Sequence, residues 1–508
     1  MKKYFMGVDV GTQQTKGILI DQNLRPVTSY AVSHTIENSQ PYHYEMDANI
    51  WWDEFCQISK ELQKSAGIES QEIAGVGVSV MGCDCISVDR EVKPIRKAIL
   101  YGIDARSVDQ IRKLDEDFGE EKVLEMFGHK PNSDDISTKI LWIKENEPEV
   151  FKKTYKFLTG SSYMVAKLTG NYWIDQYLAK GSFRPLYNDD GSFNNEYSSY
   201  FCTSDQLAKT GVVTDIAGGV NQKAAEETGL KEGTPVIIGT GDSTAESVAS
   251  GLLEEDILFA QVGSTLFYIF STNQKIPSCD LDNFPGSEIF TVPGIYAVMG
   301  GTNAAGSLTG WIRDEFYFPE RDREKGGGQN AFKIMAEEAA EIPAGSTGLV
   351  ILPYIHGERS PIHDPKARGV IFGLRGQHDR KSITRASLEA VAYSIGSHLR
   401  LFKKHNLIPN KIILAGGGTK NKVWMQIMAD VLQSEICIAE DWQTASFGDA
   451  CMAAVGSGEL ADFKELADAL PHGRIIRPNP DNFEIYQKYL DIYEELYRRN
   501  KDLMHALS

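Results

Sequence analysis

The chain has 508 residues, too many for one ordinary hydrophobic core, and this length predicts two domains or one domain with large insertions. Hydrophobic residues make up 42% and charged residues 24%, a balance that excludes disordered and fibrous proteins. The 52 basic and 70 acidic residues give a net charge of -18, which repels nucleic acids and anionic membranes, so neither is expected as a partner.

The termini and the cysteines favour a cytoplasmic location. Asp9 interrupts the apolar run that follows Lys2 and Lys3, so no signal peptide is predicted. No apolar run approaches the roughly 20 residues of a membrane-spanning helix. Seven cysteines, an odd number, predict free thiols in a reducing compartment. Cys83 and Cys85 lack a second ligand pair at metal spacing, so they are expected on a strand and not around zinc.

The first half of the chain alternates strand and helix patterns. Residues 4–21 predict a hairpin around a Gly-Thr-Gln-Gln turn. Strands are predicted at 73–80 and 97–101, followed by a polar helical stretch to about residue 157. Residues 171–200 are rich in turn residues and predict a surface loop or lid.

Residues 234–253 predict a strand, a glycine turn and a helix that begins near Ser243. Asp242 lies in this turn, at the carboxyl end of a strand, where open α/β sheets act on ligands. Ser243 and Glu246 have the spacing of a capping box, so Ser243 is expected to cap the helix. Asp242 is then free for catalysis, with a capping role for Asp242 as the alternative.

The second half repeats the first in outline. A second hairpin is predicted at 257–273, and its Val-Gly-Ser-Thr turn matches the first hairpin turn half a chain earlier, which suggests a duplication. We place the domain boundary near Ser250 and expect two α/β domains, 1–250 and 251–508. Further elements are predicted as strands at 296–301 and 411–414, an amphipathic helix at 382–404, and helices at 422–433 and from about 480.

Three glycine turns can hold phosphate groups, because backbone N–H groups without a Cβ in the way approach oxygens closely. They are Gly11-Thr12, Gly263-Ser264-Thr265 and Gly416-Gly417-Gly418. None is a P-loop, and Gly75-x-Gly77 is followed by Val80 where a dinucleotide fingerprint needs its third glycine. A nicotinamide dehydrogenase is therefore disfavoured.

Phosphoryl transfer needs phosphate donors, a metal held by carboxylate and a base for the acceptor hydroxyl. Asp9, in an apolar strand beside the first turn, is the candidate for the metal, with a buried Asp bonded to turn amides as the alternative. Lys16 faces either the phosphates or solvent.

Several segments occur in the order and form of one known family. They are GVDVGTQQTKGILID (7–21), YKFLTGSSYMVAKLTG (155–170), GTGDSTAES (239–247), LPYIHGERSPIHDPKARGVIFGL (352–374), SITRASLEAVAYSI (382–395) and AGGGTKNKVWMQIMADVL (415–432). Together they resemble the FGGY carbohydrate kinase family, nearest its xylulose kinase (pentulose kinase) subgroup, over nearly the whole chain.

The resemblance implies an α/β protein of two actin-like, ribonuclease H-like domains with a cleft between them for ATP, Mg²⁺ and a small sugar. The first domain would bind the sugar and the second the nucleotide; a homodimer is left open. The implied roles are a catalytic base at Asp242, a metal carboxylate at Asp9, a first phosphate loop at Gly11, Thr12, Gln13 and Lys16, a second at Gly263, Ser264 and Thr265, and an adenosine pocket at Gly416, Gly417, Gly418 and Asn421.

The sugar is read in this family mainly from residues 78–89 and 101–106. Where glycerol kinases carry an Arg-Glu pair, this chain has Gly82-Cys83-Asp84, and Gly82-Cys83 take the positions of the Met-His pair of xylulose kinases. The substrate candidates are Cys83, Asp84, Asp104, Arg106 and Asp242, with a surface ion pair as the alternative for Asp104 and Arg106. A ketopentose such as xylulose is expected first, and ribulose, a hexulose, gluconate or a signalling sugar stay open. A chaperone-like ATPase of the same superfamily is the alternative of another class.

Overall fold

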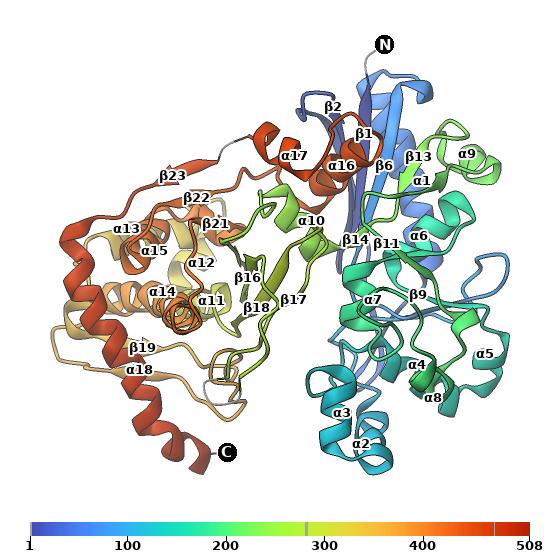
Figure 1. Ribbon diagram of the computed structural model, residues 1–508. Coiled ribbons are helices and arrows are strands. Elements are labelled where there is room, and N and C mark those ends of the chain that lie inside the picture. The colour runs from blue at the N-terminus through green and yellow to red at the C-terminus, as the bar shows by residue number, and fades with distance from the viewer. Residues whose placement is uncertain (1–2, 280–282, 472, 508) are drawn as a thin grey trace. The chain divides into compact units, whose positions relative to one another are not determined.

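The computed structural model describes residues 3–279, 283–471 and 473–507 and divides into two compact units (Figure 1). Unit 1 comprises Met1–Leu253, Ile289–Ile295 and Trp442–Leu470, and unit 2 comprises Glu254–Glu288, Tyr296–Asp441 and Pro471–Ser508. A continuous division at residue 250 therefore misses two returns of the chain to unit 1. The second return carries α16 (Ala445–Gly456), which packs on the first strand of the chain.

Unit 1 is built on a mixed seven-stranded sheet. Its strand β1 (Tyr4–Val10) pairs antiparallel with β2 (Gln14–Asp21) and parallel with β6 (Ile73–Val80), so the predicted hairpin at 4–21 and the predicted strand at 73–80 are confirmed. The order along the sheet is β12 (Ile216–Gly219), β13 (Pro235–Ile237), β6 (Ile73–Val80), β1 (Tyr4–Val10), β2 (Gln14–Asp21) and β3 (Pro26–Ser33), with β14 (Thr240–Gly241) paired to β6.

Helices cover both faces of this sheet. A Cβ atom at Gly17 would meet Ile58 of α1 (Ala48–Ala66), whereas Gly77 lies against the backbone of α16. Alternate residues of a strand point to opposite faces, so Val80, which meets α6 (Gly160–Thr169), faces away from α16. In Figure 1 the orange-red α16 lies beside the blue β1, and the contacts between these elements agree.

The rest of unit 1 surrounds the edge of the sheet. The predicted helical stretch is confirmed as four short helices. The elements are β4 (Glu37–Gln40), β5 (His43–Met46), β7 (Ile86–Val88), β8 (Ala98–Ile99), α2 (Val108–Phe118), α3 (Glu120–Phe127), α4 (Ile136–Asn146), α5 (Pro148–Lys153), β9 (Lys156–Leu158), β11 (Lys209–Gly211), α9 (Gln222–Thr228), α10 (Asp242–Ala249) and α17 (Phe463–Ala469).

Apart from the turn at 188–192, which is mostly exposed, the prediction of a surface loop or lid at 171–200 is wrong. This stretch holds β10 (Trp173–Asp175), α7 (Gln176–Ser182) and most of α8 (Asn195–Phe201), and Leu178 and Phe183 are buried in the core. Buried Asp175 accepts hydrogen bonds from the hydroxyls of Thr240, at 2.7 Å, and Thr291, at 2.6 Å. The stretch therefore supports the strand end that precedes Asp242.

Unit 2 has a sheet of the same plan. Strands β15 (Ile257–Val262), β16 (Leu266–Thr272) and β18 (Tyr296–Thr302) form an antiparallel meander. The meander is joined through β15 to the parallel strand β21 (Lys411–Ala415), as β1-β2-β3 is joined through β1 to β6. The second predicted hairpin is thus confirmed, and it occupies the place of the first. The order is β17 (Glu288–Ile289), β18 (Tyr296–Thr302), β16 (Leu266–Thr272), β15 (Ile257–Val262), β21 (Lys411–Ala415), β22 (Ile436–Ile438) and β23 (Arg474–Ile476).

Helix α14 (Arg380–Lys404) is buried nearly all round in its first five turns, so the predicted amphipathic pattern describes it only in part. The reason is that it contacts helices on several sides as well as β19. The remaining elements of unit 2 are α11 (Gly306–Phe316), α12 (Phe318–Lys325), α13 (Ala331–Ala340), β19 (Val350–Leu352), β20 (Val370–Phe372), α15 (Lys422–Leu432) and α18 (Phe483–Ala506). Single 3₁₀ turns lie at 70–72, 204–206, 346–348, 417–420 and 480–482.

All seven cysteines are free thiols, as predicted. None of the helices in the described parts of the chain is both long and apolar enough to cross a membrane.

Candidate active site

Asp242 is the first residue of α10 and follows the two-residue strand β14. The predicted capping box is wrong, because the helix begins one residue earlier than expected and Gly241 is its N-cap. Asp242 Oδ1 accepts the Ser243 N–H at 2.7 Å. The side chain is half-buried, and burial raises its pKa above the ordinary value while the hydrogen bond from the Ser243 amide opposes the shift.

A second group of acidic side chains lies on the α16 face of the unit 1 sheet. The parallel register of β1 and β6 places Asp9 beside Ser79, and the Ser79 hydroxyl lies 3.1 Å from Asp9 Oδ1. The same hydroxyl donates to Asp449 Oδ2 at 2.7 Å, and the Ser79 N–H donates to this oxygen at 3.1 Å. Sequence reasoning missed Asp449, although it is the one charged residue of an otherwise apolar helix.

The carboxyl groups of this group oppose one another's ionisation. Burial raises the pKa of Asp9 most, the charge of Asp242 raises it further, and Ser79 and Lys16 lower it. Burial and the charge of Asp9 likewise raise the pKa of Asp449 well above its ordinary value. A cation at this position would relieve both effects.

The acidic group fits a magnesium ion that is completed by phosphate and water. Asp449 Oδ1 is buried and has no hydrogen-bond partner among the described residues. No three His, Cys, Asp or Glu side chains in the described part of the chain are placed to hold a metal by themselves. Mg²⁺ usually takes only one or two carboxylates and completes its shell with water and phosphate oxygens, so Asp9 suits it.

The first glycine hairpin lies next to these carboxylates. Lys16 pairs with Asp9 in the register of β1 and β2. The Thr12 hydroxyl lies 3.3 Å from the hydroxyl of Tyr101, and Gln13 is exposed. The Gly11 N–H donates to the Gln14 carbonyl at 3.1 Å, which closes the turn.

His34, whose side chain is 4% exposed, clamps this hairpin through the Gly11 carbonyl. His34 Nε2 lies 2.8 Å from the Gly11 carbonyl oxygen, and His34 Nδ1 lies 3.0 Å from the carboxylate of Glu54. The Thr15 hydroxyl also donates to Glu54. Both ring nitrogens face acceptors, an arrangement that only the doubly protonated, charged form of the ring satisfies fully. This clamp had no signal in the sequence.

His34 is therefore expected to titrate above the ~6.5 of an ordinary histidine. Burial alone would lower its pKa, but the Glu54 carboxylate and the Gly11 carbonyl outweigh burial and raise it. The stability contributed by the clamp is complete below the unfolded pKa and is lost as the pH rises through the folded pKa. Glu54→Gln should lower the pKa of His34 by about one unit. NMR of histidine-labelled protein measures both values, and a wild-type pKa at or below that of the variant would contradict the clamp.

Asp84 lies in the segment 78–89, which the sequence predicts to bind the sugar. Its side chain is fully buried, and Oδ1 accepts the Tyr101 N–H at 2.9 Å. Oδ2 has no hydrogen-bond partner among the described residues. Burial raises the pKa of Asp84 well above the ordinary value, and the nearby charge of Lys139 opposes the shift. Leaving a buried oxygen without a hydrogen bond costs free energy, and a ligand hydroxyl that donates to it would remove this cost.

Lys139 and Ser182 hold the segment that carries Asp84. The buried Lys139 ammonium donates to the carbonyls of Cys83 and Leu100, each at 2.8 Å. Cys83 Sγ lies 3.1 Å from the Ser182 hydroxyl. Burial raises the pKa of Cys83 to about 12, so the thiol is neutral and offers at most a weak hydrogen bond.

Asp104 and Arg106 form a buried pair, neither a surface ion pair nor an open sugar site. Their side chains are 0% and 1% exposed and lie 2.7 Å apart. Asp104 also accepts the Tyr44 N–H, and Arg106 donates to Glu45 at 2.8 Å. Since both side chains are already occupied, we leave them out of the site.

The predicted nucleotide residues surround one large cavity in unit 2. Its volume is about 1010 Å³, and Gly263, Ser264, Gly417, Gly418 and Asn421 line it. Thr265 and Gly416 flank these residues in the chain without lining the cavity. The wall between them combines apolar side chains with lysines, which suits a purine and an anionic group; it includes Phe332, Met335, Leu388, Trp424, Lys333 and Lys420.

A side chain at Gly417 is expected to weaken ATP binding. Gly417 is exposed, and a Cβ built there meets no atom within 4 Å, so Gly417→Val is accommodated by the fold and projects a branched side chain at the cavity. A loss of about 1–3 kcal/mol from such overpacking raises KM for ATP roughly tenfold to hundredfold. Gly376→Val is the matched control, because Gly376 also faces open space and does not line this cavity. Equal KM values for ATP in the two variants would contradict this cavity as the nucleotide site.

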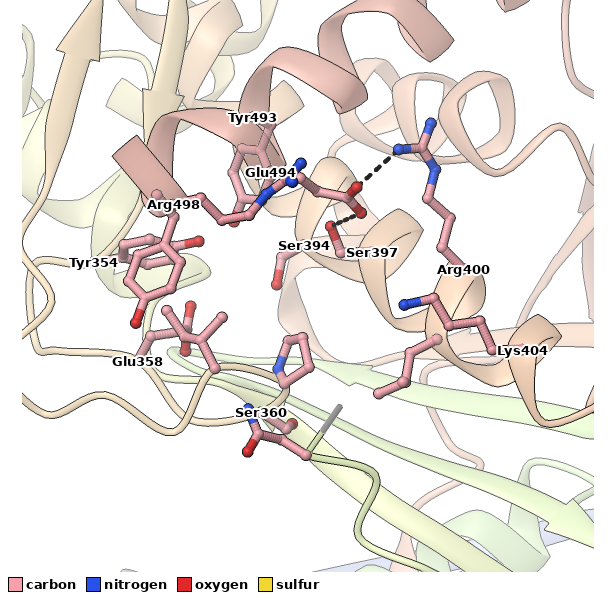
Figure 2. Close-up of a pocket in the computed structure, with 15 residues that line it drawn as sticks. Tyr354, Glu358, Ser360, Ser394, Ser397, Arg400, Lys404, Tyr493, Glu494 and Arg498 are labelled. Carbon is pink, nitrogen blue, oxygen red and sulfur yellow. Dashed lines mark hydrogen bonds and ion pairs between the residues drawn. The ribbon is translucent and has the colours of Figure 1, made fainter. Parts of the chain in front are cut away.

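A second cavity of unit 2, about 480 Å³, lies between α14 and α18 (Figure 2). Its carboxylates are already engaged. Glu494 accepts hydrogen bonds from Ser397 and Arg400, each at 3.0 Å, and Glu358 accepts the Thr302 hydroxyl and the Asn303 N–H. With its acceptors occupied, this cavity offers no base for a phosphoryl transfer.

Comparisons with known proteins agree with this architecture. The N-terminal domain of the FGGY family of carbohydrate kinases matches residues 4–249, and its C-terminal domain matches residues 259–457. The xylulose kinase of Bacillus subtilis is 27% identical over 99% of both chains, and the ribulokinase of Shouchella clausii is 26% identical over 100% of this chain and 98% of its own. The crystal structure of xylulose kinase from Rhodospirillum rubrum matches with a TM-score of 0.88 and 27% identity over 99% of this chain and 100% of its own. The predicted α/β fold of two actin-like domains is confirmed.

Proposed function

The chain belongs to the FGGY family of carbohydrate kinases, and from this we propose that it transfers the γ-phosphoryl group of ATP to a hydroxyl of a ketopentose, with xylulose as the first choice. Xylulose is supported by the full-length similarity to xylulose kinases. The observation that carries the mechanism is Asp242, a half-buried carboxylate at the head of α10 whose Oδ1 accepts the Ser243 N–H.

Asp242 acts as the general base. As the sugar oxygen bonds to the γ-phosphorus, its proton passes to the Asp242 carboxylate, and the bond between the γ-phosphorus and the β,γ-bridging oxygen breaks to release ADP. The raised pKa of Asp242 makes it a stronger base than an exposed carboxylate, yet it stays ionised at neutral pH.

Asp84 orients the sugar through Oδ2, which has no hydrogen-bond partner among the described residues, while Lys139 holds the backbone beside it. Lys16, Thr12 and the amides of the first hairpin donate to the transferred phosphoryl group. Asp9 would hold Mg²⁺, which when bound would neutralise charge on the phosphate oxygens.

The two units divide the substrates in this proposal. Residues 1–250 carry the sugar-binding groups, and residues 251–508 carry the nucleotide cavity, apart from the segments that return to unit 1. Gly263 and Ser264 meet the phosphates, and Gly417, Gly418 and Asn421 meet the adenosine, with Thr265 and Gly416 next to them in the chain.

An ADP-release assay over a sugar panel tests the proposal. The panel contains xylulose, ribulose, a hexulose, gluconate and glycerol, each with ATP and Mg²⁺. We expect the highest kcat/KM with xylulose, because a site with buried polar groups discriminates strongly against sugars that leave them unpaired. The same ADP release with and without sugar would instead indicate a chaperone-like ATPase.

A further inference from the structure

The backbone of helix α16 packs directly against the sheet of unit 1 at two glycines. Gly7 of β1 and Gly77 of β6 are neighbours in the parallel register. A Cβ atom at Gly7 would overlap the Ser446 carbonyl, and one at Gly77 would overlap the Asp449 carbonyl. Any other residue at either position would push the helix away.

This close approach carries a charged side chain into the sheet. Asp449 is 0% exposed, and its Oδ2 accepts both the N–H and the hydroxyl of Ser79. Ser79 in turn lies beside Asp9, at 3.1 Å. The Ser79 hydroxyl has a single hydrogen, so it can donate to only one of the two carboxylates at a time. Two carboxylates therefore compete for one donor.

The packing alone gives no reason for a carboxylate here. The other residues of α16 are small or apolar, and burying a charge beside a second one is costly unless a cation compensates it. Asp449 Oδ1 is buried without a partner among the described residues, so it is available to a water molecule or a ligand.

We propose that Asp449 is a positioning residue of the phosphoryl-transfer centre: it holds Ser79 and Asp9 in place for the divalent cation and accepts a hydrogen bond from the water shell of that cation through Oδ1. This inference rests on the proposed kinase function, and it extends it to a residue far from the others in sequence. Groups around a metal site that orient its ligands typically change metal affinity by about 10–100-fold when replaced.

The test uses Mn²⁺ as a probe for the cation. Mn²⁺ is titrated into the full-length protein with saturating ADP, and free Mn²⁺ is measured by electron paramagnetic resonance. Asp449→Asn keeps the size of the side chain and an acceptor for Ser79 but removes the charge. We expect it to weaken Mn²⁺ binding about tenfold and to raise by a similar factor the Mg²⁺ concentration at half-maximal kcat, with kcat restored at high Mg²⁺.

Asp430→Asn is the matched control. Asp430 is also a buried aspartate on a helix, and it accepts hydrogen bonds from Gln426, Asn482 and the Asn479 N–H in unit 2. Its replacement is expected to leave Mn²⁺ affinity unchanged. Wild-type Mn²⁺ affinity and wild-type Mg²⁺ dependence in Asp449→Asn would overturn the proposal. A loss of kcat that high Mg²⁺ does not restore would also overturn it, because a purely structural role is not rescued by Mg²⁺.

If Asp449→Asn does not fold, Ser79→Ala decides. It removes the hydroxyl between the two carboxylates while the residue 79 amide still donates to Asp449. Weakened Mn²⁺ binding is again expected, and unchanged binding overturns the proposal.

Mn²⁺ and ADP binding needs no sugar. A wild-type protein that binds both but phosphorylates no sugar therefore contradicts the kinase function, whereas equal Mn²⁺ binding in wild type and variants contradicts the role of Asp449.

Discussion

Asp242→Asn is expected to lower sugar-dependent ADP release by roughly 10²–10⁴-fold, the usual range for the loss of a general base. The amide keeps the shape of the side chain and can still accept the Ser243 N–H, so the head of α10 should be preserved. It cannot take a proton from the sugar hydroxyl. ADP affinity, measured by calorimetry, should stay within about twofold of wild type, because the nucleotide cavity is lined by other residues.

The exposed Glu226→Gln on α9 removes one negative charge from the same unit and is the control for Asp242→Asn. It should leave turnover unchanged. Near-normal turnover in Asp242→Asn would rule Asp242 out as the base. The pH profile offers a second check: because the pKa of Asp242 is raised, kcat/KM should fall on acidification at a pH above the ~4 of an ordinary carboxyl group.

Asp84→Ala is expected to lower kcat/KM for the sugar by about 10²-fold and to leave KM for ATP unchanged. The variant deletes the buried oxygen for which the described residues supply no partner, and a hydrogen bond to a charged group of this kind contributes about 1.5–3 kcal/mol. Steady-state kinetics with each substrate varied in turn separates the two effects.

Ser87→Ala is the control for Asp84→Ala, because the Ser87 hydroxyl on β7 is also buried without a described partner. It should leave the sugar kinetics unchanged, and an equal loss in both variants would mean that disturbed packing, and not sugar binding, is responsible. Asp84→Asn tests whether the Asp84 carboxyl group is protonated when the sugar binds. It retains activity if Asp84 is protonated and donates to the sugar, and it loses activity if the carboxylate accepts.

Local patterns carried much of the fold. Residues close together in sequence specify the two glycine hairpins, the strand before Asp242, and the helices α10 and α15 that follow glycine turns. The same is true of the nucleotide cavity, because Gly263 and Gly417 lie at strand ends that the parallel pairing of β15 and β21 brings together.

The features that could not be predicted from the sequence depend on contacts between residues far apart in the chain. Asp449 meets Ser79 and Asp9 across more than 350 positions, through glycines whose purpose appears only when α16 is in place. The segment 171–200 is rich in turn residues, yet Asp175 and Leu178 are buried by tertiary packing. Asp104 and Arg106 resembled a ligand pair, and only their burial against each other shows that both are occupied.

The most direct test of the kinase function is the stoichiometry of ADP and phosphorylated sugar formed from ATP and xylulose by the wild-type protein. ³¹P NMR follows both products in one sample. We predict one sugar phosphate for each ADP, with neither product formed above background by Asp242→Asn. ADP formation without a sugar phosphate, from xylulose or from any other sugar of the panel, would contradict this account.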